Sequence, residues 1–285
     1  MIRLCAFSDE AAADLAGQAD ALERNGIRMT ELRSVGGKNV RDLSLREAKE
    51  IRAYLAGRGI SVWSVGSPLG KIDLAAADEA YLDVAEHVCE LAAALGTDKV
   101  RAFSFFHAYG EKNRVLDVCN AMAERARRWG VTLCHENEKE IYGDTAARVR
   151  ELMEGLEGWK FVYDPANFLQ VGERAEDTLP LAERCEYFHI KDVIAATGEL
   201  VPAGSGAGAI DRLIGYAHGN KTLTLEPHLA LFESFREIDG GEMKHKFVYR
   251  SRSEAFDAAV GALRALLERQ GYADNGEGYL YAGGN

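Results

Sequence analysis

Four segments in the second half of the chain each end a run of strand-favouring residues with a side chain that can bind a metal. These segments are VTLCHE ending at Glu136, KFVYD ending at Asp164, YFH ending at His189 and LTLE ending at Glu226. Three carboxylates and one imidazole form an oxygen-rich ligand set that suits Mn²⁺, Mg²⁺, Co²⁺, Fe²⁺ or Zn²⁺. The residues therefore predict one catalytic divalent metal, provided that the fold brings them together.

The spacing of these residues predicts such a fold. They lie 28, 25 and 37 residues apart, which is about the length of a unit built from a short strand, a loop and a helix. Repeated units of this kind form a parallel sheet, and closing the sheet brings the ends of its strands to one rim. We therefore predict a (β/α)8 TIM barrel. Its eight strands are expected at residues 2–7, 29–32, 60–65, 99–105, 131–135, 160–163, 187–190 and 222–225.

The connections between the expected elements agree with a barrel. Gly26, Gly96 and Gly130 stand where helices give way to strands, and glycine tolerates the left-handed conformation that ends a helix. No GxGxxG turn follows the first strand, which disfavours a doubly wound open sheet. Ser251 and Glu254 are spaced as a capping box at the start of the last helix.

No linker divides the 285 residues into two blocks of domain size. We expect a single barrel over residues 1–270 and a C-terminal extension over residues 271–285. The extension contains Tyr272, Tyr279 and Tyr281, so it either packs on a barrel rim or a neighbouring subunit, or is a loosely held terminus.

Composition narrows the classes of partner. Lys and Arg number 34 and Asp and Glu number 45, which gives a formal net charge of −11, so no nucleic-acid partner is expected. The start, MIRLCAFSDE, has one Arg and few apolar residues before Asp9, which predicts a strand there and neither a secretory signal nor a membrane span. The five cysteines are scattered without CxxC pairing, which favours reduced thiols and a cytoplasmic protein.

These motifs resemble the sugar isomerase and epimerase superfamily with xylose isomerase-like TIM barrels, which includes inosose dehydratases and ketose epimerases. The motifs that match are Glu136-Asn137, Asp164 with Asn167 three residues later, HIKD at 189–192, Glu226, and GSGAGAID at 204–211. The resemblance implies that Glu136, Asp164, His189 and Glu226 bind one divalent metal, with manganese as the first expectation.

The chain departs from one branch of this superfamily. Ketose 3-epimerases have a His three residues after the Asp ligand, an Arg six after the His ligand and a Glu six after the first Glu ligand. This chain has Asn167, Ala195 and Tyr142 at those positions. The departures weigh against a ketose 3-epimerase, and the HIKD motif is closer to the inosose dehydratase and general epimerase branches.

The resemblance also implies a mechanism. In related epimerases a pair of Glu ligands removes a proton from one face of the sugar and returns it to the other, so Glu136 and Glu226 are the expected catalytic pair. A metal that polarises the substrate carbonyl would stabilise the resulting enediolate. Lys191 is expected to protonate or bind a developing oxyanion with Asp192 holding it in place, or else to form a salt bridge with Asp192 at the rim.

Other residues near the strand ends are candidate substrate contacts, each with a structural role as the alternative: Glu31, Trp63, His107, Asn167 and His228. Arg33 stands at the same rim, and Trp63 with Phe103, Phe105 and Phe106 could form an apolar wall or belong to the core. Cys134 is expected in the core, and His135 is expected to point away from the side of Glu136 by strand alternation.

We therefore predict a metal-dependent isomerase or epimerase acting on a sugar, polyol or keto-sugar. The substrate is expected to lack phosphate, because the glycines at 204–208 are not followed by the Lys and Ser or Thr of a phosphate loop. Two alternatives stay open: a lyase of the inosose dehydratase type, in which loss of a β-hydroxyl follows proton abstraction, and a noncatalytic sugar-binding barrel. The sequence leaves the oligomeric state open, a homo-oligomer included.

Overall fold

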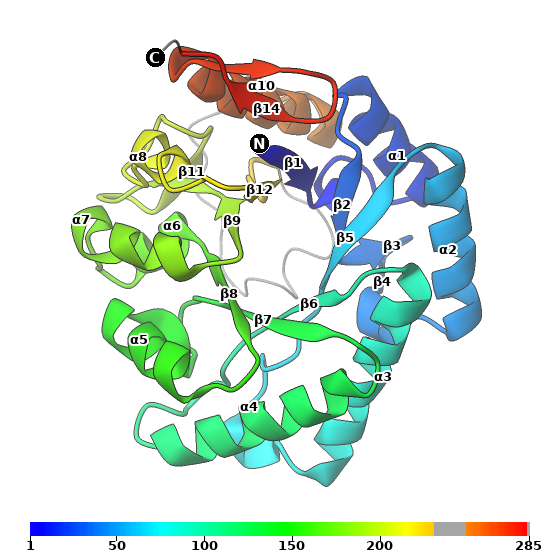
Figure 1. The fold of residues 1–285 in the computed structure, drawn as a ribbon, viewed down its shortest axis with the longest axis vertical. Helices are drawn as coiled ribbons and strands as arrows, with labels where there is room; N and C mark the ends of the chain where they lie inside the picture. The colour runs from blue at the N-terminus through cyan, green and yellow to red at the C-terminus, as the bar shows by residue number, and fades with distance from the viewer. Residues whose placement is uncertain (231–248, 284–285) are drawn as a thin grey trace.

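The computed structural model describes residues 1–230 and 249–283. Its centre is a closed barrel of eight parallel strands in the order β1-β12-β9-β8-β7-β6-β5-β2, seen nearly end-on in Figure 1. The strands are β1 (Arg3–Ala6), β2 (Met29–Leu32), β5 (Ser61–Gly66), β6 (Lys99–Ala102), β7 (Thr132–Glu136), β8 (Lys160–Tyr163), β9 (Tyr187–Ile190) and β12 (Thr222–Leu225). All eight overlap predicted strands, although the strand predicted at 99–105 ends at Ala102, so the predicted (β/α)8 barrel is confirmed.

Helices surround the barrel on the outside (Figure 1). They are α1 (Leu15–Arg24), α2 (Leu45–Gly57), α3 (Glu79–Leu95), α4 (Lys112–Arg127), α5 (Ala146–Gly155), α6 (Pro165–Gln170), α7 (Ala175–Thr178), α8 (Ile210–Ile214) and α10 (Arg252–Arg269). In α3 the buried Val88, Ala92 and Leu95 recur at helical spacing and face the sheet. Asp78 caps the start of α3, and Gly96 ends it at a φ of 85°.

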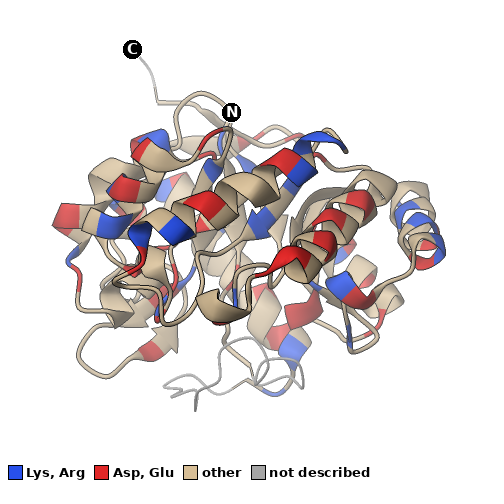
Figure 2. Ribbon diagram, turned by 90° about the horizontal axis from the view of Figure 1, so that it is seen from below, with Lys and Arg blue, Asp and Glu red and all other residues tan. Residues whose placement is uncertain are grey.

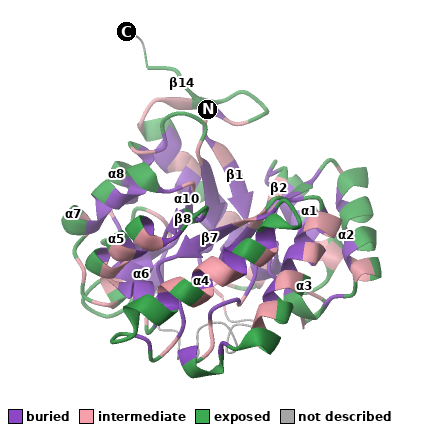
Figure 3. Cartoon of the chain, turned by 60° about the horizontal axis from the view of Figure 1, so that its bottom comes forward, coloured by how far each residue is buried: buried purple, intermediate pink, exposed green. Residues whose placement is uncertain are grey.

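Short hairpins complete the chain: β3 (Ser34–Val35) with β4 (Lys38–Asn39), β10 (Asp192–Ile194) with β11 (Glu199–Val201), and β13 (Tyr272–Asp274) with β14 (Tyr279–Tyr281). Figure 3 shows that burial follows this architecture, with buried strands inside and exposed outer faces of the helices. The main apolar core fills the layer between sheet and helices. Cys134, Val162 and Tyr187 form a small separate cluster of buried residues, so Cys134 is a core residue as expected.

The last helix packs on the outside of the barrel against α1 and α8, and the tail that follows it lies at the N-terminal end of the barrel. The Ser251 side chain accepts the Glu254 amide, but the Glu254 carboxylate accepts the amide of Arg250, so only half of the predicted capping box forms. Ile2, which precedes β1, exchanges two backbone hydrogen bonds with Tyr279, and the Tyr279 ring is buried. The described part of the tail therefore packs against the barrel end.

The described surface shows no segregated basic face on the side drawn in Figure 2, where Lys and Arg alternate with Asp and Glu along the outer helices. All five cysteines are free and buried. Among the described helices, none has the length and apolar character needed to cross a membrane.

Candidate metal centre at the barrel rim

The four predicted ligands converge at the carboxyl ends of four adjacent barrel strands. Glu136 ends β7, Asp164 follows β8, His189 lies in β9 and Glu226 follows β12. One ligand atom from each lies within 4.8 Å of every other, and all four side chains are buried. Ligands about 2.1 Å from one ion lie no more than about 4.2 Å apart, so small side-chain movements would let these four share an ion.

His189 lies between the two glutamates. Its Nδ1 is 2.9 Å from Glu136 Oε1 and 3.2 Å from Glu226 Oε2. The other oxygen of each glutamate accepts from an arginine: Arg101 donates to Glu136 Oε2 at 2.6 Å and Arg33 donates to Glu226 Oε1 at 3.0 Å. Each carboxylate therefore has one oxygen facing the cluster and one fixed by a buried guanidinium.

Asp164 and Lys191 form the third side of the cluster. Lys191 Nζ lies 2.9 Å from Asp164 Oδ2 and 3.6 Å from Glu226 Oε2. These contacts are ionic, and neither Asp164 Oδ2 nor Glu226 Oε2 accepts a hydrogen bond of ordinary geometry, although both atoms are buried. Two buried anionic oxygens with incomplete hydrogen bonding beside an imidazole fit a hard or borderline divalent cation.

The charges in the cluster shift one another's pKa values. Burial raises the pKa of Glu136, but the charges of His189 and Arg101 outweigh it and lower this pKa to about 2. Burial also raises the pKa of Asp164, and here it prevails over Lys191, so that this pKa is about 6. Burial lowers the pKa of His189, but Glu136 and Glu31 raise it well above its ordinary value. Without a metal, the imidazole therefore holds a second proton near neutral pH.

Glu31 is fully buried within the barrel, behind His189. It is 3.2 Å from His189 Nε2 and accepts a hydrogen bond of 3.0 Å from the Tyr187 hydroxyl. The structure therefore places Glu31 where it orients the imidazole, while its predicted contact with substrate stays a prediction.

Asn167 also touches the cluster. Its amide donates 3.3 Å to Glu136 Oε1 and 2.9 Å to the Asn137 carbonyl, while its backbone N–H donates to Asp164 Oδ1 at the start of α6. Asn137 in turn exchanges two hydrogen bonds with the Asp164 backbone. The EN and DPAN motifs therefore hold the ends of β7 and β8 in register.

His228 lies next to Glu226. Its Nε2 is 3.6 Å from Glu226 Oε1, and its Nδ1 is 2.9 Å from Glu10 Oε1. Arg33 also contacts Glu10 and donates both Nε and Nη2 to Asp9. His228 is thus brought to the edge of the site, as expected for a residue that follows the last strand.

Two predicted contact residues lie elsewhere. Trp63 is inside the barrel near the N-terminal strand ends, where Lys99 and Arg3 approach its ring at 4.5 and 5.5 Å. His107 is on the exposed rim with its Nδ1 beside Asp73, 2.5 Å away. The structure brings neither side chain to the ligand cluster. Trp63 lies near the N-terminal end of the barrel, and the side chain of His107 points towards solvent.

The expected pairing of Lys191 with Asp192 is wrong. Lys191 points to Asp164 instead, and Asp192 accepts backbone N–H groups from Val193, Gly204, Gly206 and Gly208. Successive residues of a strand point to opposite sides, so the two cannot face one group. Asp192 anchors the glycine-rich segment. By contrast, His135 points away from Glu136 as expected, with its Nε2 2.9 Å from Ser104 Oγ.

The sequence interpretation missed Arg101, Asp9 and Lys71, the last of which forms an ion pair with Glu138 at 2.9 Å. Arg101 lies within β6, in KVRA, and is buried inside the barrel. A charged residue within a strand of a fully covered sheet was the available signal, because such a side chain needs a partner inside the barrel.

Comparison with known proteins agrees with this architecture. A family model described as xylose isomerase-like TIM barrel matches residues 19–228. Among solved structures, the probable 3-DHS dehydratase AsbF from Bacillus anthracis has a TM-score of 0.70 and 16% identity, covering 93% of this chain and 99% of that chain. The IOLI protein with a bound zinc atom has a TM-score of 0.69 and 16% identity, and the match covers 94% of this chain and 98% of that chain.

An L-ribulose 3-epimerase structure is similar to the same extent, with a TM-score of 0.70, 18% identity and coverage of 94% of both chains. At these identities the likeness of the structures shows a shared fold. The search of curated proteins found no match. The family model spans most of the barrel and reaches from α1 to the end of β12, so the chain belongs to the family of xylose isomerase-like TIM barrels.

Proposed function

We propose that the protein is a divalent-metal-dependent isomerase or epimerase that acts on a sugar or keto-sugar by removing a proton next to a carbonyl. The observation that carries this proposal is the buried convergence of Glu136, Asp164, His189 and Glu226 at the barrel rim. Neighbours of the same fold include proteins named as L-ribulose 3-epimerase and D-psicose 3-epimerase, which supports an enzyme of this class.

The four residues would hold the metal through three carboxylates and His189 Nδ1. We expect Mn²⁺ first, with Mg²⁺, Co²⁺, Fe²⁺ and Zn²⁺ as alternatives, and a zinc atom is bound in the similar IOLI structure. A divalent ion in this position would polarise a substrate carbonyl and so acidify the adjacent C–H bond.

Glu136 and Glu226 are the proposed proton-transfer pair. They approach His189 Nδ1 from β7 and from the end of β12, so a substrate lying over the cluster would have a carboxylate towards either side. Arg101 and Arg33 fix the outer oxygens, which limits rotation of each carboxylate and orients the inner oxygen for transfer. Both carboxylates are ionised near neutral pH, because nearby cations keep their pKa values low, and are ready to accept a proton.

Lys191 is the proposed proton donor to oxygen. It is buried, and burial lowers its pKa, but Asp164 and Glu226 raise this pKa well above its ordinary value, so Lys191 stays protonated. Its ammonium group lies beside Glu226, where it can stabilise negative charge that develops on a substrate oxygen.

The same arrangement favours a second candidate, a dehydratase of the inosose type. A protonated Lys191 only 3.6 Å from Glu226 places a donor for a leaving hydroxyl beside a base. The similar structure named as a probable 3-DHS dehydratase supports this candidate. Proton removal is common to both reactions, and the fate of the β-hydroxyl separates them. For either reaction we place the protein in the cytoplasm, in line with its free, buried cysteines.

Metal analysis combined with hydrogen exchange tests the proposal. The purified protein should bind one equivalent of Mn²⁺, and Asp164→Ala and Glu226→Ala should each weaken binding by at least about a hundredfold. Glu50→Gln, on the exposed face of α2, is the matched control and should leave affinity unchanged.

With a turned-over substrate in D₂O, deuterium should enter the carbon next to the carbonyl. An enone or diketone absorbance would identify the dehydratase instead. A protein that binds sugars but no divalent metal would be the noncatalytic barrel, and that result would overturn the proposal.

A further inference from the structure

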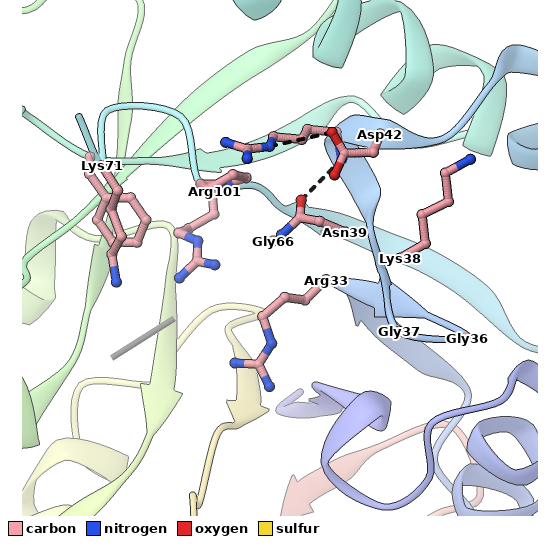
Figure 4. A pocket seen from close by; sticks show the side chains of 12 residues that line it. Arg33, Gly36, Gly37, Lys38, Asn39, Asp42, Gly66, Lys71 and Arg101 are labelled. Carbon is pink, nitrogen blue, oxygen red and sulfur yellow. Dashed lines mark hydrogen bonds and ion pairs between the residues drawn. The ribbon is translucent and has the colours of Figure 1, made fainter. Parts of the chain in front are cut away.

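A cavity of about 600 Å³ opens beside the candidate metal centre, large enough for a sugar-sized molecule. Its lining comes from the loop after β2, the loop after β5, and β6 with the residues that follow it, as Figure 4 shows. The lining residues that bear on its chemistry are Arg33, Lys38, Arg41, Lys71, Arg101 and Phe103.

This cavity and the metal ligands occupy opposite halves of one rim. The ligands come from β7, β8, β9 and β12, whereas the cavity lies on the side of β2, β5 and β6. Arg33 and Arg101 belong to both, since they line the cavity and bind the glutamate ligands Glu226 and Glu136. A substrate whose carbonyl lies at the cluster would therefore extend its other end into the cavity.

The lining is strongly cationic. Five of its twelve residues are Lys or Arg and only Asp42 is acidic, in a chain whose net charge is −11. Lys38 and Arg41 are at the exposed mouth of the cavity. Lys38 pairs with Glu47 and Arg41 pairs with Asp42, so these two cations contribute little to specificity for a ligand. The inner positive charge comes from Arg33, Arg101 and Lys71, whose side chains point to the same side in Figure 4.

Arg101 has donors that its protein contacts do not use. Its Nη1 donates to Glu136, while its buried Nε has no hydrogen-bond partner. Within residues 1–230 and 249–283 no acceptor is bonded to its Nη2 either. Only 3% of Arg101 is exposed, and a buried Nε without a hydrogen bond is costly unless a ligand accepts from it.

Lys71 and Phe103 line the same cavity as Arg101. The guanidinium of Arg101 and the ammonium of Lys71 both lie over the Phe103 ring, 4.6 and 4.5 Å from its centroid. Lys71 also pairs with Glu138 at 2.9 Å, and only 13% of its side chain is exposed. The ring and Glu138 hold the two cations at one wall of the cavity.

We propose that the substrate carries an anionic group, a carboxylate or a phosphate, which binds Arg101 and Lys71 while its carbonyl end occupies the metal centre. This inference rests on the proposed function for the position of the carbonyl end. A planar guanidinium edge with an unused Nε donor, in a cavity that an ammonium also lines, suits an oxyanion better than a neutral hydroxyl, because a charged acceptor forms the stronger hydrogen bonds. The substrate class is thus an acidic or phosphorylated sugar or keto-sugar, and a phosphorylated substrate would depart from the expectation drawn from the glycines at 204–208.

Titration calorimetry of the Mn²⁺-loaded protein with matched probes tests this. D-Glucuronate and D-xylose share a ring and differ by one carboxylate. D-Glucose 6-phosphate is the probe that carries a phosphate. The anionic probe that fits should bind at least about tenfold more tightly than D-xylose, as expected for a charge-assisted contact. Lys71→Gln should remove most of that preference, Lys71→Arg should retain it, and Arg46→Gln on the exposed face of α2 should leave it unchanged.

Tighter binding of glucuronate assigns the group as a carboxylate, and tighter binding of glucose 6-phosphate assigns it as a phosphate. The inference is overturned if neither anion binds better than D-xylose, or if Lys71→Gln keeps the full preference. Mn²⁺ is titrated into the same protein beforehand. Failure to bind the metal would count against the proposed function, whereas stoichiometric metal without anion preference would count only against this inference.

Discussion

The carboxylate of Glu31 lies directly behind the imidazole of His189, with Glu31 Oε2 3.2 Å from His189 Nε2. The Nδ1 of the same ring faces Glu136 and Glu226. An Nε2–H that donates to Glu31 fixes the tautomer whose Nδ1 is free for a metal once its own proton leaves. Glu31 therefore decides which nitrogen of His189 would act as a ligand to a bound metal.

The first prediction concerns this carboxylate. Glu31→Gln should weaken Mn²⁺ binding by about tenfold to a hundredfold, because a neutral amide orients the imidazole but no longer increases its basicity. Metal titration of the variant measures the effect, with the surface change Glu50→Gln as control. Tyr187→Phe removes only the hydroxyl that donates to Glu31 and should have a smaller effect. Equal affinity of Glu31→Gln and wild type would show that Glu31 is only a packing residue.

The second prediction is a pH dependence of metal binding. In the metal-free protein His189 holds an extra proton, since Glu136 and Glu31 raise its pKa although burial lowers it. Burial raises the pKa of Asp164 to about 6. Binding at pH 7.5 should release about one proton, so affinity should rise about tenfold for each pH unit. Below pH 6, metal binding also displaces the proton of Asp164. The affinity for Mn²⁺ should then rise by about a hundredfold for each pH unit.

Calorimetry in two buffers of different ionisation enthalpy counts the released protons directly. Affinity that is independent of pH between 6.5 and 8, with no proton release, would contradict the assignment of His189 as a ligand.

The barrel was predictable because its signals are local and repeated. Apolar runs, glycines such as Gly96 and amphipathic stripes such as that of α3 recur in most of the units, so an error in one would not change the topology. The convergence of the four candidate ligands was predictable for the same reason, since strand ends meet at one rim. The compensating charges were not predictable, because the contacts of Arg101 with Glu136 and of Arg33 with Glu226 depend on side-chain rotamers and join residues of different strands.

The error at Asp192 has a different cause. Its neighbour Lys191 suggested an ion pair, but the partners of Asp192 are backbone N–H groups. The identity of a residue does not show which backbone N–H groups will donate to a side chain. The signal was the spacing of the glycines. A Cβ at Gly206 would lie 2.4 Å from Asp192 Oδ1, so the glycines mark where the backbone approaches the carboxylate.

The third prediction follows from these contacts. Asp192→Asn should destabilise the protein by about 2 kcal/mol, because an amide cannot accept four N–H donors and turns its own N–H towards some of them. Gly206→Ala should destabilise it as well, by steric overlap with the same carboxylate. Urea unfolding measures both, and the exposed Ser205→Ala in the same segment is the control. Wild-type stability of Asp192→Asn would show that water replaces these bonds without cost.

The last prediction concerns His135, on the outer side of β7 next to Glu136. Burial lowers its pKa to about 3, whereas an unfolded histidine titrates near its ordinary value of about 6.5. Between these values the unfolded state binds the proton and the folded state does not, so stability falls as the pH drops below about 6.5. From pH 7.5 to 5.5 this residue alone should cost about 1.4 kcal/mol.

Urea unfolding of wild type and His135→Asn at both pH values isolates the contribution of His135 to the pH dependence of stability. The contributions of other groups cancel in the difference between the two proteins. The variant should be less stable at pH 7.5 and lose about 1.4 kcal/mol less than wild type on acidification. Ser104→Ala removes the hydrogen-bond partner of His135 but keeps the imidazole buried, so it should retain the pH dependence of the wild type. If all three proteins lose the same stability, His135 is either solvated or already protonated in the folded state.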